Sequence, residues 1–444
     1  MDRIKAFFAP PKASAEEYEP LADDDSGTLE GSIYEEATPF SWIEYSIFAL
    51  IGVAMLWAWN MFLAAAPYFQ IRFQSDPWIY ASSQSAITST STVVNLGAML
   101  ILTRIQSSAN YPPPHQHRPP GLMQNGAFSF VASFGRPEYT QAIMVGQGVA
   151  GILPPLAQMF SYLAFTDPSP GINPPDQPSS EASASLQNDE GATAAFVYFL
   201  TAVVISALTV LAFIPLVRRH SLLTRCRLAP SPGTDLSQST TTLNSATEGE
   251  ETAQLGAQAL PTRRHVPLAT LFRKLRWLAA AVAMCFVVAM FFPVFTAKIL
   301  SVHDGDPAGG GLFSPGAFIP LGFFFWNLGD LAGRVSAVLP PFAWLRRHPR
   351  VLFAVGLARW VFLPLYLLCN LHGRGAVVGS DLFYLVVVQF PFGLTNGWLG
   401  SSAMMAAGEW VDEDEREAAG GFMGMCLVGG LALGSVLSFT AAGV

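Results

Sequence analysis

The sequence predicts an all-α membrane protein that crosses the bilayer many times, and both its composition and the length of its apolar runs indicate that fold class. Of the 444 residues, 51% are hydrophobic and only 13% are charged, whereas soluble domains carry roughly 25% charged residues. The charges gather in a few segments and leave apolar runs near the ~20 residues that a helix needs to cross a bilayer. These runs lack the alternation of barrel strands, and only helices or closed barrels satisfy backbone polar groups in lipid.

Nine apolar runs are long enough to be full spans, and one is about half as long. The predicted full spans are 43–66, 84–104, 140–165, 194–217, 276–300, 316–338, 350–371, 381–405 and 419–441. The short segment Leu122–Phe134 is expected to insert halfway or to lie at the cytoplasmic side. The expected regions are an acidic cytoplasmic tail, an N-terminal transmembrane bundle, a polar cytoplasmic loop of disordered composition and a C-terminal transmembrane bundle. Their boundaries are 1–42, 43–217, 218–274 and 275–444.

Positive charges orient the predicted spans. Lysines and arginines flank the loop 218–274, and Arg346 and Arg347 lie between two later spans, whereas the loop 166–193 has neither Lys nor Arg. Because Lys and Arg concentrate in cytoplasmic loops, the N-terminus is expected in the cytoplasm and the loop 166–193 outside. The acidic first 42 residues do not resemble a cleavable signal, so the first span is expected to serve as its own anchor.

The cysteines, the net charge and the aspartates argue against several function classes. Cys226, Cys285, Cys369 and Cys426 are scattered, a spacing that fits neither a disulfide framework nor a metal site. The net charge of −8 gives no reason to expect a nucleic-acid partner. An intramembrane aspartyl protease needs two aspartates within spans, and Asp330 has no second one. We therefore expect that the protein is not an enzyme and has neither a cofactor nor an obligate protein partner. Its expected partners are the lipid bilayer and a transported solute.

A charge pair within one apolar span is the main candidate for a solute site. Asp330 and Arg334 lie four residues apart and can pair along one helix face, one turn after Asn327. A charge at bilayer depth costs on the order of 3 kcal/mol even on lenient insertion scales, so it is normally paired and functional. The alternative is a helix lock or gate that never touches the solute. Arg359 is expected to pack, or to reach toward the membrane edge, rather than to bind a ligand.

Other polar and aromatic positions are weaker candidates. One face of the second predicted span carries a polar stripe, which either lines a cavity or forms hydrogen bonds between helices. The stripe consists of Gln84, Thr88, Ser91 and Asn95. In the first span, Trp59 and Asn60 could meet a planar ring or simply pack in the core. Pro293 follows Phe292 inside a span and is expected to kink it.

Several motifs, in this order along the chain, resemble those of the equilibrative nucleoside transporter family. They are Trp59-Asn60-Met61-Phe62, Gly146-Gln147-Gly148-Val149-Ala150-Gly151, Phe292-Pro293, Asp330-x-x-Gly333-Arg334, Arg359-x-x-Phe362-x-Pro364 and Asn396-Gly397-Trp398-Leu399. Together they cover most of the chain and are far more specific than any one of them. The resemblance implies eleven spans in a six-plus-five arrangement related to the major facilitator fold, with a central cavity exposed alternately to each side.

The resemblance also implies the roles of particular side chains. Asp330 and Arg334 would bind the ribose hydroxyls, Gln124 would bind the base, and Trp59 would pack near it. Further side chains could line the cavity. These are Asn60, Gln84, Thr88, Ser91, Asn95, Phe292, Pro293, Asn327 and Asn396. A preference for nucleosides or nucleobases, facilitated or proton-coupled flux, and a plasma or vacuolar membrane location all remain open.

One stretch departs from the family pattern. Arg104 is followed by a segment rich in Pro and His and then directly by Gln124, so the third family span and the outer half of the fourth are expected to be missing. A truncated or mis-spliced gene explains this more simply than a new architecture. Losing one span and half of its partner preserves the orientation of everything downstream. An inactive homologue, or a carrier of another organic solute, are therefore the alternatives to nucleoside transport.

Overall fold

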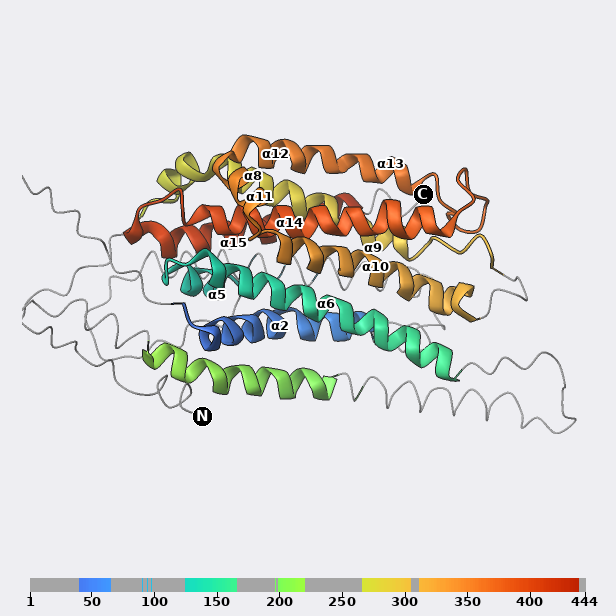
Figure 1. Cartoon of the computed structure of the whole chain (residues 1–444), viewed down its shortest axis with the longest axis horizontal. Coiled ribbons are helices and arrows are strands. Elements are labelled where there is room, and N and C mark those ends of the chain that lie inside the picture. The colour runs from blue at the N-terminus through green and yellow to red at the C-terminus, as the bar shows by residue number, and fades with distance from the viewer. Residues whose placement is uncertain are drawn as a thin grey trace, which may run out of the picture.

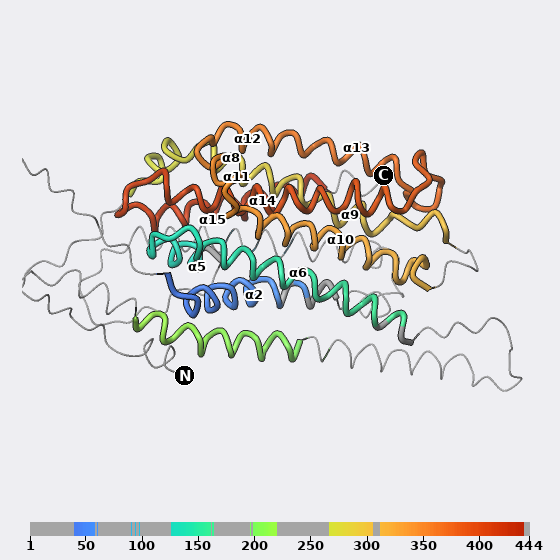
Figure 2. Tube along the Cα trace, in the orientation of Figure 1, coloured from blue at the N-terminus to red at the C-terminus, as the bar shows by residue number. Residues whose placement is uncertain are grey.

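The computed structural model describes residues 40–64, 90, 94, 97, 124–165, 196, 199–219, 266–304 and 311–438. Within these residues all regular elements are helices, apart from one isolated antiparallel bridge between Ile299 and Leu371. The longer helices lie roughly side by side along the long axis of the molecule (Figure 1), as the tube trace in the same orientation also shows (Figure 2). The prediction of an all-helical protein is confirmed.

The chain order of the helices follows the predicted spans closely. The α-helices are α2 (Trp42–Ala64), α5 (Gln124–Ala132), α6 (Pro137–Phe165), α8 (Leu268–Ala289), α9 (Phe291–Thr296), α10 (Pro315–Ser336), α11 (Pro340–Ala343), α12 (Pro349–Ala358), α13 (Phe362–Tyr366), α14 (Phe390–Ala407) and α15 (Arg416–Ser438). Another helix, Phe199–Arg219, lies between α6 and α8 in the chain. Short 3₁₀ turns are η1 (Gly311–Phe313), η2 (Trp344–Arg347), η3 (Arg359–Val361) and η5 (Glu413–Glu415), and η4 (Phe383–Gln389) is a π-helix.

Five helices in the described part of the chain are long and apolar enough to cross a membrane. They are Pro137–Phe160, Phe199–Arg219, Leu268–Thr296, Pro349–Tyr366 and Glu413–Ser438. Helices α10 and α14 run beside them, and both contain glycines and polar residues among their apolar ones. The predicted span 84–104 lies outside the described residues, except for three isolated positions. The full number of nine spans therefore stays a prediction.

Prolines interrupt the regular helix at two places, between α8 and α9 and between η4 and α14. Because Pro293 has no backbone N–H, the carbonyl of Ala289 loses its helical hydrogen bond. Helix α8 ends at Ala289, and α9 begins at Phe291. Pro391 likewise leaves a carbonyl one turn earlier without its donor, and the π-helix η4 immediately precedes it. The kink predicted for this span corresponds to the interruption at Met290, one turn before Pro293. Helix α8 begins at Leu268, before the predicted start of that span at 276, because the buried Leu271 and Leu275 continue its apolar face.

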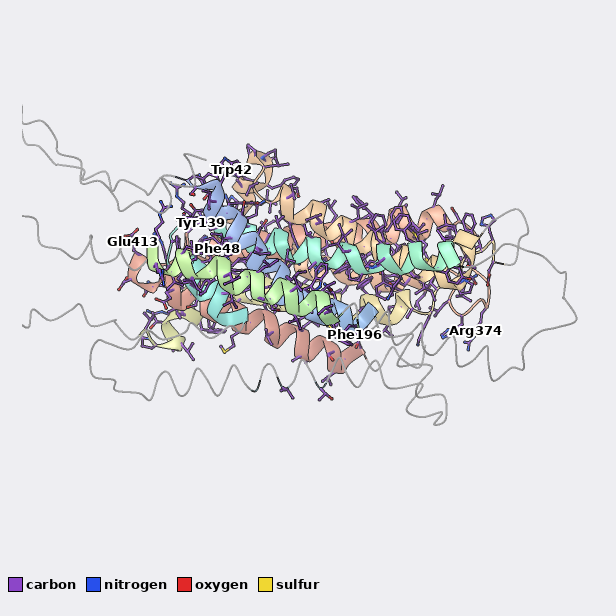
Figure 3. The ribbon with its side chains drawn as sticks, turned by 90° about the horizontal axis from the view of Figure 1, so that it is seen from below. Trp42, Phe48, Tyr139, Phe196, Arg374 and Glu413 are labelled. Carbon is purple, nitrogen blue, oxygen red and sulfur yellow. The ribbon has the colours of Figure 1, made fainter. Side chains whose placement is uncertain are left out.

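Helix α6 occupies the centre of the arrangement, packed on α2 at one side and on α10 at the other. Helix α10 also packs along α14, and α15 packs on α8 and on the short helix α5. The described part of the predicted half-length segment Leu122–Phe134 contains the short helix α5, which the hydroxyl of Ser129 ties to α15 by donating to the carbonyl of Glu417 at 2.8 Å. Figure 3 places Trp42, Tyr139 and Glu413 at one end of the molecule and Arg374 at the other.

Candidate functional site

The predicted charge pair forms on α10. Nε of Arg334 donates to Oδ2 of Asp330 at 2.6 Å, one helical turn away, and the two residues are only 4% and 3% exposed. Burial at this depth is costly for each charge alone, so the pair and its further hydrogen bonds must stabilise both groups. The pairing that the sequence spacing predicts is confirmed.

Glycines bring α14 against this part of α10. A side chain at Gly329 or Gly333 of α10 would overlap backbone atoms of Phe390 or Leu394 in α14. A side chain at Gly397 of α14 would in turn overlap the backbone of Asp330. Since small residues let two helix backbones approach closely in a membrane, these positions set the distance across which α14 side chains reach the charge pair.

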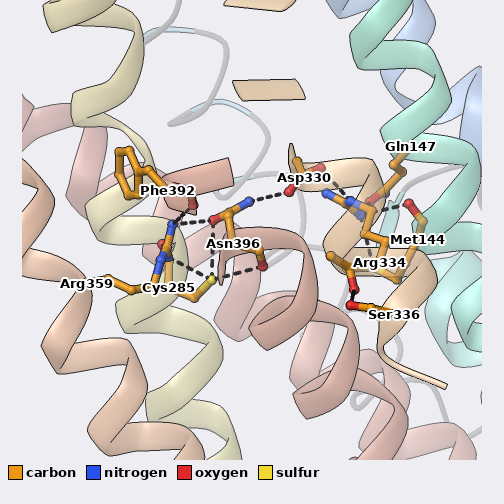
Figure 4. Close-up of polar contacts among 10 residues, drawn as sticks. Met144, Gln147, Cys285, Asp330, Arg334, Ser336, Arg359, Phe392 and Asn396 are labelled. Carbon is orange, nitrogen blue, oxygen red and sulfur yellow. Dashed lines mark hydrogen bonds and ion pairs between the residues drawn. The ribbon is translucent and has the colours of Figure 1, made fainter. Parts of the chain in front are cut away.

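Asn396 is the side chain of α14 that contacts the charge pair. Its Nδ2 donates to Oδ1 of Asp330 at 2.8 Å, and its Oδ1 accepts from Nη2 of Arg359 at 3.0 Å (Figure 4). Of the two expectations for Arg359, packing or reaching toward the membrane edge, the structure shows packing. The residue is 1% exposed and its guanidinium is held between the helices. The expectation that it does not bind a ligand directly is consistent with this position.

Helix α6 completes the surroundings of Arg334. Nη1 of Arg334 donates to the carbonyl of Met144 at 2.9 Å and to Oε1 of Gln147 at 3.2 Å. Nε2 of Gln147 is buried and has no hydrogen-bond partner, and Nη2 of Arg334 has none among the described residues. Two donors of this hydrogen-bonded group are therefore without an acceptor among the described residues, and the one on Gln147 is buried. A buried donor without an acceptor is costly, which favours a ligand that supplies oxygen acceptors here.

The polar chain from Gln147 to Arg359 contains two guanidinium groups and one carboxylate (Figure 4). It crosses from α6 through α10 and α14 to η3. Charges interact strongly in such a low-dielectric interior, so a change in any one member alters the position and charge balance of the others.

A pocket of about 100 Å³ lies elsewhere, between α5, α6, α14 and α15. Its lining includes Arg136, Glu409 and Arg416 and excludes Asp330 and Arg334. We place the candidate site at the charge pair, because Asp330 and Arg334 are buried charged groups and belong to one of the quoted family motifs.

Comparisons with known proteins agree with the motifs. The family described as "Nucleoside transporter" matches residues 181–442, more than half of the chain. The nucleoside transporter FUN26 of Saccharomyces cerevisiae is 28% identical over 89% of this chain and 83% of its own length. Equilibrative nucleoside transporter 1 is 28% identical in Homo sapiens, over 72% of this chain and 65% of the human protein. The Rattus norvegicus protein is 26% identical over 88% of this chain and 95% of its own length.

This chain belongs to the equilibrative nucleoside transporter family. It is therefore an integral, multi-pass membrane protein of a transporter family and not an enzyme. The family resemblance that the sequence motifs indicated is confirmed.

The structure of this transporter brings some predicted site residues together and leaves others apart. Asp330, Arg334 and Asn396 form one hydrogen-bonded group. Asn327 lies one turn before Asp330, but its Nδ2 donates to the carbonyl of Phe323 in its own helix at 2.8 Å. Asn60 instead ties α2 to α6, donating to the carbonyl of Ala150 at 2.8 Å.

Phe292 and Pro293, which were expected to line the cavity, lie in an aromatic part of the core, and their role in a cavity stays a prediction. Phe292 stacks on Trp326 with ring centroids 4.1 Å apart, inside a buried apolar cluster, and Pro293 follows in α9. The side chains of Trp59 and Gln124 lie outside the described part of the structure, although α2 and α5 contain both residues. The second-span stripe also lies outside the described residues. Its members are Gln84, Thr88, Ser91 and Asn95.

The sequence reasoning missed two members of the polar chain, Gln147 and Arg359. Both belong to the quoted family motifs, and both are uncommon residue types for the middle of an apolar span. A polar residue that lies in an apolar span and also belongs to a family motif was the signal that could have identified both. Their pairing with Arg334 and Asn396 could not be read from spacing, because the partners are on other helices.

Proposed function

We propose that this transporter moves nucleosides across a membrane by alternating access, with Asp330, Arg334 and Gln147 in the ribose-binding part of its site. The observation that carries the proposal is a pair of donors without an acceptor among the described residues, Nη2 of Arg334 and Nε2 of Gln147, in the same hydrogen-bonded group as the carboxylate of Asp330. A vicinal diol offers both acceptor oxygens and donor hydrogens, and this arrangement matches both.

The names of the relatives support the solute class, since FUN26 and the mammalian proteins are described as nucleoside transporters. Trp59 and Gln124 would complete the site from the N-terminal side, as the family resemblance implies. A cytoplasmic N-terminus, and a vacuolar or plasma membrane location, belong to the same proposal. Its six-plus-five arrangement would have α6 and α10 facing each other across the two bundles.

Uptake of radiolabelled uridine and adenosine into vesicles that carry the full chain tests the proposal. Asp330→Asn and Arg334→Ala each remove a charged hydrogen-bond partner, and we expect uptake to fall by about 10- to 100-fold, since such bonds contribute about 1.5–3 kcal/mol. Asp414→Asn is the matched control, because that carboxylate is exposed at the end of the bundle. Normal uptake by the two variants would refute the site, whereas no uptake by the parent would refute transport by this chain.

A second candidate is an inactive homologue. The alignment with the rat transporter runs over 472 positions, more than the 444 residues of this chain, so it contains positions at which this chain has no residue. The predicted loss of a span between Arg104 and Gln124 would account for some of these positions. The decisive comparison is uptake by the chain as it stands and by a version with the missing hairpin restored. Reading the transcript between the codons for Arg104 and Gly121 shows which version the gene encodes.

A further inference from the structure

We propose that Arg359 and Asn396 act together as a positioning pair that fixes one oxygen of Asp330 for the substrate. The inference rests on the proposed function and adds two residues that would not touch the nucleoside themselves. Arg359 would hold the amide of Asn396, and Asn396 would hold Asp330 (Figure 4).

Donor and acceptor chemistry fixes the direction of this pair. A guanidinium can only donate and a carboxylate can only accept, so an amide between them has a single satisfied orientation. Oδ1 of Asn396 must face Arg359 and Nδ2 must face Asp330, as the distances of 3.0 and 2.8 Å show. With Arg334 on Oδ2 and Asn396 on Oδ1, both oxygens of Asp330 are anchored from different helices.

Arg359 is itself held in place by neutral groups. Nη1 donates to the carbonyl of Cys285 at 2.6 Å, Nε donates to Oγ1 of Thr395 at 3.3 Å, and the guanidinium lies 4.9 Å from the ring centre of Phe392. Every hydrogen-bond acceptor found for Arg359 within the described residues is uncharged. The one carboxylate in the polar chain is Asp330, which Arg359 reaches through Asn396 and shares with Arg334, so the two ends of the pair are coupled electrostatically.

The backbone also favours a positioning role. Gly393 and Gly397 flank Asn396 on α14, and a side chain at either position would overlap the backbone of α10. The amide of Asn396 is therefore presented at a fixed distance from Asp330, and it is 2% exposed. A rigid support of this kind maintains the geometry of a binding group without contacting the ligand.

The substitution Asn396→Asp separates positioning from simple packing. The new carboxyl group has nearly the same shape, but it can donate to Asp330 only when it is protonated. The charged or titratable groups around it are Asp330 and Arg334 of α10, Arg359 of η3 and Cys285 of α8. Repulsion between two carboxylates at this distance favours a shared proton, whereas Arg334 and Arg359 favour the ionised forms, so we expect the proton to bind only at acidic pH.

We expect the ratio of uridine uptake by Asn396→Asp to uptake by the parent to rise at least tenfold from pH 8 to pH 5. Ser402→Ala is the control on the same helix, since its buried hydroxyl has no hydrogen-bond partner in the described part of the chain, and its ratio to the parent should not change with pH. A pH-independent ratio for Asn396→Asp overturns the positioning pair. Absence of uptake by the parent would instead refute the proposed function.

Arg359→Lys provides the second measurement, and it decides the matter if Asn396→Asp yields no folded protein. An ammonium cannot reproduce the planar fork that reaches both Cys285 and Asn396. We expect the KM for uridine uptake to rise about tenfold, with a smaller change in maximal rate. The rate is divided by the amount of folded transporter, which size-exclusion chromatography measures. A purely structural arginine would reduce the folded amount and leave KM unchanged, and that result would overturn the inference.

Discussion

Helix α10 makes two close helix contacts, and they differ in what the glycines meet. Toward α14, side chains added at Gly329, Gly333, Gly393 or Gly397 would overlap backbone atoms of the neighbouring helix. Toward α6, a side chain at Gly148 or Gly151 would meet mainly the side chains of Leu331, Arg334 and Asn327. Backbone cannot move aside locally, whereas side chains can change rotamer.

The contact between α2 and α6 resembles the one between α10 and α14. Side chains at Gly52 or Gly146 would overlap backbone oxygens of Ile143 or Ala49. Two helix pairs are thus joined backbone to backbone, and α6 and α10 connect them through side chains. We expect the pairs to move as units and the contact between α6 and α10 to change during transport, as alternating access requires.

The largest expected effect comes from breaking the α10–α14 contact. Gly397→Ala places a methyl group onto the backbone of Asp330, so the two helices must separate or misfold, and we expect most of the folded protein to be lost. Fluorescence-detected size-exclusion chromatography in detergent measures the folded fraction. Gly400→Ala is the matched control on α14, because its new methyl group would lie 3.5 Å from the ring of Phe286, an ordinary contact. Equal yields of the two variants would contradict rigid packing at Gly397.

An intermediate effect is expected at the α6–α10 contact. Gly151→Ala requires the amide of Asn327 to turn away, which a side chain can do, so folded protein should remain while uptake falls several-fold. Gly146→Ala on the same helix faces the backbone of Ala49 and should instead lose folded protein. Chromatography and uridine uptake of the two variants distinguish these outcomes. A loss of folding in both would mean that the two contacts of α6 do not differ.

The smallest effect is expected at an exposed charge contact between the start of α15 and α8. Lys274 donates to Asp412 at 2.8 Å, and this hydrogen bond lowers the pKa of Asp412 below its ordinary value of 3.8. A lowered carboxyl pKa adds stability above the unfolded pKa, and that stability is lost as pH falls through the folded pKa, here below pH 3.8. Asp412→Asn should leave uptake unchanged and barely alter the melting temperature at pH 7, because exposed pairs are screened by solvent. A clear loss of uptake would show that this contact belongs to the moving part.

Much of this architecture could be predicted from the sequence. Apolar length predicts the helices, and the spacing of four residues between Asp330 and Arg334 predicts their pairing, because both features are local and follow from helix geometry. The break before Pro293 is local for the same reason. Arg359 shows the limit, since its position in an apolar segment was compatible with the membrane edge until its partners on α8 and α14 were known.

The sequence by itself determined the family, the helical class and the intrahelical charge pair of this transporter, because these depend on composition, motif order and periodicity along one chain. Only the tertiary structure decided which side chains surround that pair. Gln147, Asn396 and Arg359 come from three other segments, and their hydrogen bonds depend on how closely glycines let the helices approach. Distances between helices are set by packing, and no spacing along the chain encodes them directly.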